Sequence, residues 1–237
     1  AAAPLVEILA IHHRTNPVLT NALMADYPSC EQSGFFSILR GAKVWDDLDK
    51  LGVPGITGVY SHPAVAGGFG MTIVSLKQQY AGHASQVLSL AAQVPGGAYY
   101  TKFIIAVDED IDPSDMDQVL WAMGGRCAPI NDFDFLRNTW STGLDPSQNP
   151  PEVRPYGSKV LINACIEHRY LPTFSKRTKL RKAMYDQVAE RWSDLGLPGT
   201  IPNILAFEEE GEGRAAANVY HDEKSMRDAR DIAKGEK

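Results

Sequence analysis

The chain has 237 residues, of which 44% are hydrophobic and 22% are charged, so it can bury a core and has the composition of an ordinary globular protein. Its net charge of −6 disfavours nucleic-acid binding, because no basic face that would neutralise phosphates is implied. No run of about 18 apolar residues occurs, so we expect no membrane-spanning helix, and the widely spaced Cys30, Cys127 and Cys165 predict neither a zinc site nor a disulfide framework.

The first half of the chain alternates between strand and helix patterns. Short apolar runs favour strands, and the near-helical spacing of Phe35, Ile38, Trp45 and Leu48 favours a helix. The predicted elements are strands at 5–11 and 18–23, a helix from Ser29 or Glu31 to Gly52, strands at 56–60 and 71–76, and a helix at 83–93.

The second half continues the alternation. The predicted elements are a strand at 103–107, a helix capped by Ser114 and ended by Gly124 and Gly125, an edge strand around Phe133 and Phe135, a loop over 139–156, a strand at 160–164 and an amphipathic helix at 178–195. Strands that alternate with helices indicate a layered α/β domain.

Residue chemistry alone nominates no active site. The chain lacks the glycine-rich phosphate-binding fingerprints, the HExxH zinc motif and the GxSxG nucleophile elbow. The acidic run at 108–112 could suggest a divalent-cation site. These carboxylates lead into the start of the predicted helix at Ser114, where negative charge is favourable, so we predict a helix-end role instead.

Four short motifs follow one another in a distinctive order. They are QYAGHA at 79–84, YTKF at 100–103, VDEDID at 107–112 and VLWAM at 119–123, with Arg126 close behind. In order and spacing they resemble the C-terminal half of the UbiD family, which decarboxylates aromatic and unsaturated acids with prenylated FMN. The later runs LDPSQ and RPYGSK, ending at Gln148 and Lys159, resemble the branch that acts on hydroxybenzoate-like or heteroaromatic acids.

The resemblance implies a fold and a domain organisation. We expect a UbiD C-terminal-domain-like fold, with a layered mixed β-sheet flanked by helices and an extended C-terminal helix or tail. Residues 1–205 would form this α/β domain, with 1–25 alternatively ending a preceding flavin-binding domain, and residues 206–237 would form a tail for oligomer contacts. The family's first half carries the flavin-binding domain, the metal ligands and the catalytic Arg-Glu-Glu network, so we expect this chain to be a C-terminal fragment, a separate domain or a separate subunit.

Carried over residue by residue, the resemblance also predicts parts of a site. The predicted substrate-pocket lining is Leu19, Asn21, Tyr99, Trp140 and Thr142, and Arg126 is predicted to lie near a bound monovalent cation. The alternatives are core positions for Leu19, Tyr99 and Trp140, and helix capping or pairing with Asp132 for Arg126. No catalytic residue and no metal ligand is predicted within this chain.

The cofactor implied by the resemblance is prenylated FMN, with Mn and K ions in the full enzyme. A lysine that some members place just upstream of the Tyr99 position, where it reaches the cofactor phosphate, is Gly96 here. We therefore expect the cofactor to be bound mainly by residues outside this chain.

The function expected from the resemblance is that of a lid and oligomerisation part of a reversible decarboxylase of aromatic, heteroaromatic or α,β-unsaturated acids. The expected partners are such an acid, the flavin-binding half and further copies of the chain, in a homodimer or higher homo-oligomer, with no nucleic acid and no membrane. The alternatives are a non-catalytic assembly module or a subunit of a carboxylase complex, and an unrelated α/β hydrolase. Free thiols favour a reducing compartment, so we expect a cytoplasmic location.

Overall fold

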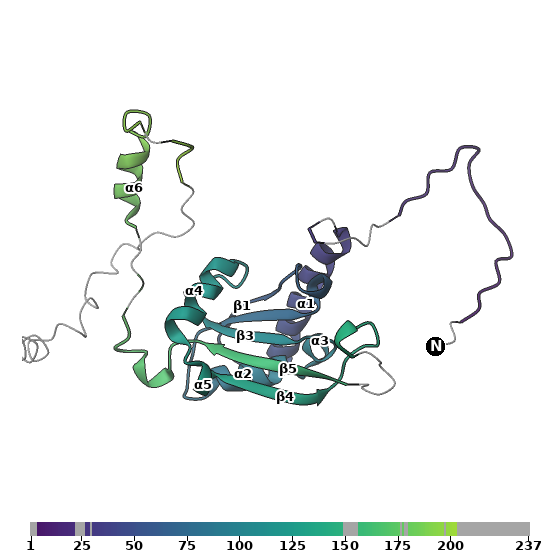
Figure 1. The fold of residues 1–237 in the computed structure, drawn as a ribbon, viewed down its shortest axis with the longest axis horizontal. Helices are drawn as coiled ribbons and strands as arrows, with labels where there is room; N and C mark the ends of the chain where they lie inside the picture. The colour runs from purple at the N-terminus through teal and green to yellow at the C-terminus, as the bar shows by residue number, and fades with distance from the viewer. Residues whose placement is uncertain are drawn as a thin grey trace, which may run out of the picture. The chain divides into compact units, whose positions relative to one another are not determined.

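The centre of the chain is a mixed β-sheet. The structure, a computed structural model, describes residues 4–21, 27–28, 30–148, 156–175, 177, 180–196 and 198–202. In this part of the chain five strands pair in the order β1-β2-β3-β5-β4 (Figure 1). They are β1 (Ile56–Ser61), β2 (Met71–Leu76), β3 (Phe103–Asp108), β4 (Phe133–Thr139) and β5 (Gly157–Ala164). The three middle strands are parallel, and β1 and β4 pair antiparallel at the two edges, which confirms the predicted mixed sheet.

Helices cover both faces of this sheet. The helices are α1 (Glu31–Lys50), α2 (His83–Ala91), α3 (Pro95–Ala98), α4 (Met116–Arg126) and α5 (Pro129–Asp132), with short 3-10 turns at Ala66–Gly68 and Pro146–Gln148. Side chains of α1 and α2 pack on one face of the sheet and those of α4 pack on the other. The predicted layered α/β architecture is therefore confirmed.

Two apolar cores follow from the two-residue period of the strands. Ile104 of β3 and Leu161 of β5 lie on the face that packs against Leu48 of α1. Ile105, the next residue of β3, lies on the opposite face with Val119 of α4. Successive side chains of a strand point to opposite faces, so a sheet that is covered on both sides needs continuous apolar strands. This is the pattern from which β3 was predicted.

The limits of α4 differ from the prediction. Asp115, and not Ser114, is the N-cap, and its carboxylate accepts hydrogen bonds from two main-chain N–H groups of the first turn. The helix also continues through Gly124 and Gly125 and ends at Arg126. Glycine weakens a helix by only about 1 kcal/mol. The buried Arg126 side chain in the last turn forms ion pairs with Asp108 and Asp110, which connect this end of the helix to the end of β3.

The predicted strands at 5–11 and 18–23 are wrong for the residues that the structure describes. Residues 4–21 form no strand, and the side chains of Leu5, Leu9 and Leu19 are almost fully exposed. Residues 22 and 23 lie outside the described residues. An apolar pattern predicts that a segment tends to be buried, but it does not identify the surface that buries it.

The contacts of the chain group into two units, Ala1–Cys165 and Ile166–Lys237. In the second unit, the described elements are a 3-10 turn at His168–Tyr170 and α6 (Lys182–Ala189). The helix is shorter than the predicted 178–195, because residues 190–196 form turns, and positions 178 and 179 lie outside the described residues. The predicted tail at 206–237 also lies outside them. None of the helices in the described part is long and apolar enough to span a membrane.

Candidate functional site

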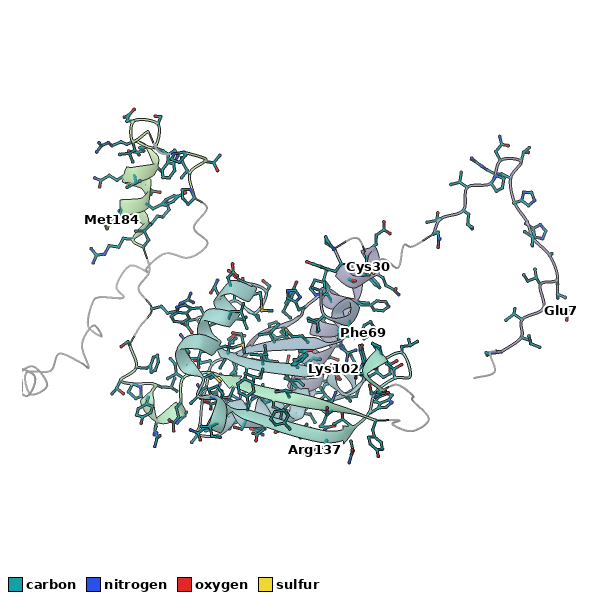
Figure 2. The ribbon with its side chains drawn as sticks, in the orientation of Figure 1. Glu7, Cys30, Phe69, Lys102, Arg137 and Met184 are labelled. Carbon is teal, nitrogen blue, oxygen red and sulfur yellow. The ribbon has the colours of Figure 1, made fainter. Side chains whose placement is uncertain are left out.

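A cavity of about 480 Å³ lies at the amino ends of the parallel strands. Its walls come from the segments that precede β2, β3 and β5, and from the start of α1. The lining residues are Tyr27, Cys30, Ser33, Pro63, Ala64, Ala66, Gly67, Phe69, Tyr99, Tyr100, Thr142 and Leu144. Figure 2 shows Cys30, Phe69 and Lys102 toward this end of the sheet. Parallel strands bring these segments together although they are far apart in the sequence.

A row of aromatic rings forms one side of the cavity. Phe69 and Tyr99 meet edge to face with their ring centroids 6.4 Å apart, and Tyr99 meets Trp140 in the same way at 5.2 Å. The Arg40 guanidinium lies over the Phe69 ring, 4.9 Å from its centroid. Edge-to-face pairs at these distances are mutually stabilising. The row therefore presents a firm, mainly apolar surface to the cavity.

An ion pair with a buried carboxylate fixes the loop that carries Thr142 to Lys102, the residue that precedes β3. Lys102 Nζ lies 2.8 Å from Asp145 Oδ1, and the Asp145 side chain is only 1% exposed. Asp145 Oδ1 also accepts a hydrogen bond from the Ser147 N–H at 3.0 Å. Burial acts to raise the pKa of Asp145, but the hydrogen bonds from Lys102 and Ser147 outweigh it and hold the pKa below its usual value. The Asp145 carboxylate therefore stays charged at neutral pH.

The lining has hydroxyl groups and one thiol, and none of the described residues that line it carries a charge. Burial raises the pKa of the Tyr100 hydroxyl, so this group remains a hydrogen-bond donor at neutral pH. Such a wall suits a flat, neutral ring with hydrogen-bonding substituents. It does not suit a phosphate, which needs cationic groups or converging main-chain N–H groups.

The structure brings together three of the predicted lining residues. Tyr99 and Thr142 line the cavity, and the Trp140 ring packs against Tyr99. Trp140 is 65% exposed, so the alternative of a core position is wrong for it. Leu19 and Asn21 lie on the exposed segment 4–21 and are not among the cavity residues, and Leu19 is not a core residue either.

Arg126 lies at the other end of the sheet. Its guanidinium pairs with Asp108 at 2.9 Å and with Asp110 at 2.7 Å. The predicted pairing with Asp132 is therefore wrong, and Asp108 and Asp110, which were predicted to favour the start of α4, pair with a residue of its last turn. Burial acts to lower the pKa of Arg126, and the hydrogen bonds with Asp110 and the charge of Asp108 raise it overall. Since β3 spans about 16 Å from Phe103 to Asp108, this network is well separated from the cavity, and a role of Arg126 beside a cation stays a prediction.

Gly96 occupies a place where a side chain would collide with α1. Its N–H donates to Asp47 Oδ2 at 2.8 Å, and an added Cβ would lie 2.8 Å from the main-chain nitrogen of Val44. A lysine could not be accommodated here without a shift of the helix. Among the described residues, no three His, Cys, Asp or Glu side chains gather in a way that could hold a metal ion.

Several cavity residues were missed by the sequence analysis. Phe69 follows two glycines with positive φ, Gly67 at 64° and Gly68 at 88°, and this tight turn places its ring in the aromatic row. The only sign in the sequence was the glycine-rich run, which indicated a turn but not that Phe69 would line a cavity. Cys30 is the N-cap of α1 and Ser33 lies in its first turn, and neither carried a signal of a site.

The QYAGHA motif has a structural role away from the cavity. Gly82 has a φ of 84° and is the N-cap of α2, a left-handed conformation that favours glycine. His83 is fully buried, its Nδ1 accepts a hydrogen bond from the Gln79 N–H at 3.2 Å, and its ring stacks on Tyr80. Burial lowers the pKa of His83, which favours the neutral ring. The motif therefore fixes the turn from β2 into α2.

Comparison with known proteins identifies the family. The profile of the 3-octaprenyl-4-hydroxybenzoate carboxy-lyase C-terminal domain (UbiD) matches residues 34–164. A phenolic acid decarboxylase from Sedimentibacter hydroxybenzoicus is 33% identical over 161 residues, which make up 67% of this chain and 32% of that protein. The chain thus spans about a third of the length of this relative.

Solved structures share the fold. The closed form of the vanillic acid decarboxylase from Sedimentibacter hydroxybenzoicus is 28% identical, with a TM-score of 0.61 over 77% of this chain and 37% of its own. The UbiD-class enzyme HmfF from Pelotomaculum thermopropionicum, solved in complex with FMN, is 21% identical, with a TM-score of 0.57 over 65% of this chain and 33% of its own. The α/β part of this protein is a UbiD C-terminal domain, and the chain belongs to the UbiD family.

Proposed function

We propose that this chain is the C-terminal part of a prenylated-FMN-dependent, reversible decarboxylase of aromatic, heteroaromatic or α,β-unsaturated carboxylic acids. The observation that carries the proposal is the uncharged, aromatic-lined cavity at the amino ends of β2, β3 and β5. It is supported by the relatives, of which one is a phenolic acid decarboxylase and another a vanillic acid decarboxylase.

In this proposal the chain supplies one wall of the substrate site. Tyr99, Tyr100 and Thr142 bind and orient the ring of the acid, and the aromatic row excludes water from it. Correct orientation alone can contribute several kcal/mol to a rate enhancement. Closure of this wall over a bound substrate would give the chain the role of a lid.

The cofactor and the catalytic acids belong to the preceding half of the enzyme. The wall fits a flat ring, while its uncharged lining and the crowded position of Gly96 do not fit a cofactor phosphate. When bound, prenylated FMN would supply the electron sink for the loss of carbon dioxide. Phosphate and metal binding, with Mn and K ions, are therefore assigned to residues outside this chain.

Reconstitution of the enzyme from its two halves tests whether the cofactor and the catalytic acids are bound outside this chain. The chain is assayed with prenylated FMN, Mn²⁺ and K⁺ for release of carbon dioxide from 4-hydroxybenzoate, first alone and then with the flavin-binding half. We expect turnover only when both parts are present. In the active form, Tyr99→Ala should lower kcat/KM by at least about tenfold, since it removes an aromatic face that orients the ring. Tyr170→Ala, which changes a half-exposed tyrosine of the second unit, is the matched control and should have no effect.

Two results would count against the proposal. Turnover by the chain alone would mean that the catalytic acids lie within it. Equal kcat/KM values for the Tyr99→Ala variant and the control would mean that the cavity is not the substrate site.

An assembly role for the second unit is a second proposal, supported by α6. Met184 and Val188 of α6, with Leu180 two residues before the helix, follow one another at four-residue spacing, and each is 42–56% exposed. An amphipathic helix with an exposed apolar stripe is stable mainly when it is docked on a partner. We expect homo-oligomers whose mass in light scattering falls when Met184 and Val188 are both replaced by serine, and an unchanged mass would reject a role of α6 in assembly.

A further inference from the structure

Lys159 of β5 is the largest fully buried side chain among the described residues, with 1% exposure. A buried ammonium group is costly unless all its donors are satisfied. Lys159 Nζ donates to three main-chain carbonyl oxygens, those of Gly97 at 3.3 Å, Ala98 at 2.8 Å and Thr101 at 2.7 Å. The first two acceptors are the last residues of α3, and Thr101 lies in the segment that joins α3 to β3.

A second cation holds the same segment. Arg40 of α1 donates from Nη2 to the main-chain oxygen of Tyr99 and to Thr101 Oγ1, the latter at 2.8 Å. The two cations therefore engage the carbonyl groups of residues 97, 98, 99 and 101. At the start of the segment, Asp47 accepts a hydrogen bond from the Gly96 N–H. Charged side chains from α1 and β5 thus fix the backbone of residues 96–101, here called the clamped segment.

The clamped segment carries two rings of the cavity wall, Tyr99 and Tyr100. Tyr100 has a φ of 66°, a left-handed conformation that is unfavourable for a residue with a side chain and persists only where the surroundings hold it. Lys102 Nζ also lies over the Tyr100 ring, 5.5 Å from its centroid. The placement of both rings therefore depends on the backbone conformation of the clamped segment, which the hydrogen bonds from Lys159 and Arg40 fix.

We propose that Lys159, acting together with Arg40, is a positioning residue that sets the geometry of the Tyr99–Tyr100 wall of the cavity. The expected effect on catalysis rests on the proposed function, whereas the expected effect on the mobility of Tyr99 and Tyr100 does not. If Lys159 served only to fill space, methionine would replace it without loss, because an apolar side chain of similar volume often substitutes well for a buried charge.

Amide hydrogen exchange of the full chain tests the clamp. Lys159→Met removes all three donors, and Lys159→Gln retains two, so we expect exchange in residues 97–101 to increase by at least about tenfold in the first variant and by less in the second. Val119→Ala is the control, because it weakens the core on the opposite face of the sheet and should leave this segment unchanged relative to the rest of the domain. If Lys159→Met does not fold, Arg40→Met tests the same segment.

Kinetics of the chain combined with the flavin-binding half test the functional consequence. We expect Lys159→Met to lower kcat for 4-hydroxybenzoate by at least about tenfold, with Lys159→Gln intermediate and Val119→Ala unchanged. Unchanged exchange in residues 97–101 would overturn the clamp. A loosened segment with an unchanged kcat would overturn the positioning role. Absence of turnover in the wild-type assembly would reject the proposed function, while the exchange experiment would still decide the role of Lys159 in the wall.

Discussion

Replacement of Asp145 by asparagine tests how the Thr142 loop is held. Lys102 and Asp145 form a 2.8 Å ion pair in which the carboxylate is 1% exposed and the lysine side chain 31% exposed. Removing one member of a fully buried pair costs about 3–5 kcal/mol. The partial exposure of Lys102 lowers the expected loss in the free energy of unfolding to about 2 kcal/mol. This corresponds to roughly a 30-fold change in the unfolding equilibrium constant.

Urea denaturation followed by circular dichroism measures this loss. With an m-value of about 2 kcal/mol/M, the midpoint should fall by about 1 M. Asp134→Asn, the same change at an exposed position of β4, is the matched control and should shift the free energy of unfolding by less than about 0.5 kcal/mol. A double-mutant cycle with Lys102→Met isolates the pair, and additive effects of the two changes would refute the reasoning.

The Lys102–Asp145 pair also leads to a prediction of how the stability of the domain changes at acidic pH. Because the pKa of Asp145 is lower in the folded than in the unfolded state, the pair contributes stability above about pH 4. This contribution should be lost as the pH falls through the folded-state pKa. The difference in stability between wild type and Asp145→Asn should therefore be constant from pH 5 to 7 and shrink below pH 4, and a difference that grows on acidification would contradict the assignment.

Three further predictions concern the clamped segment and the far end of the sheet. Gly97→Ala should destabilise the domain by about 3 kcal/mol in urea denaturation, because the added Cβ would lie 1.7 Å from the main-chain oxygen of Ala91, whereas Gly143→Ala, with nothing within 4 Å of its Cβ, should be nearly neutral. Arg126→Met should cost about 3 kcal/mol, because it removes the guanidinium that pairs with Asp108 and Asp110, and a loss below about 1 kcal/mol would contradict a stabilising network. Burial, with the nearby Arg40 charge, lowers the pKa of Lys159 from 10.5 to about 8, so the unfolded state binds more protons between these values. The stability of wild type relative to Lys159→Met should accordingly rise between pH 8 and 10.5, by up to about 3 kcal/mol, and a flat difference would disprove the shift.

The sheet could be predicted from the sequence because its middle strands are covered on both faces. The continuous apolar run at 103–107 reflects that environment, and the limits of β2 and β3 were predicted within one residue. The ends of α4 were less predictable. Its N-cap depends on local geometry that several polar residues could satisfy, and its last turn depends on ion pairs with acids from the end of β3.

The candidate site was predictable only where the family resemblance reached it. Tyr99 and Thr142 were placed by that resemblance, whereas Phe69 and Cys30 join the wall through the topology of the sheet. Lys159 shows the limit most clearly. Lysine is normally a surface residue, and nothing local in a sequence shows that an ammonium group will meet three carbonyl oxygens.

The separation of part of the cavity wall from the two apolar cores has a consequence for engineering. Leu144 is 86% exposed and Thr142 lies on the loop that precedes β5, so neither contributes to the two apolar cores. If the cavity is the substrate site proposed above, a combinatorial library at these two positions would alter its selectivity and leave both apolar cores unchanged. Variants could then be selected for a changed ligand preference separately from selection for a stable fold.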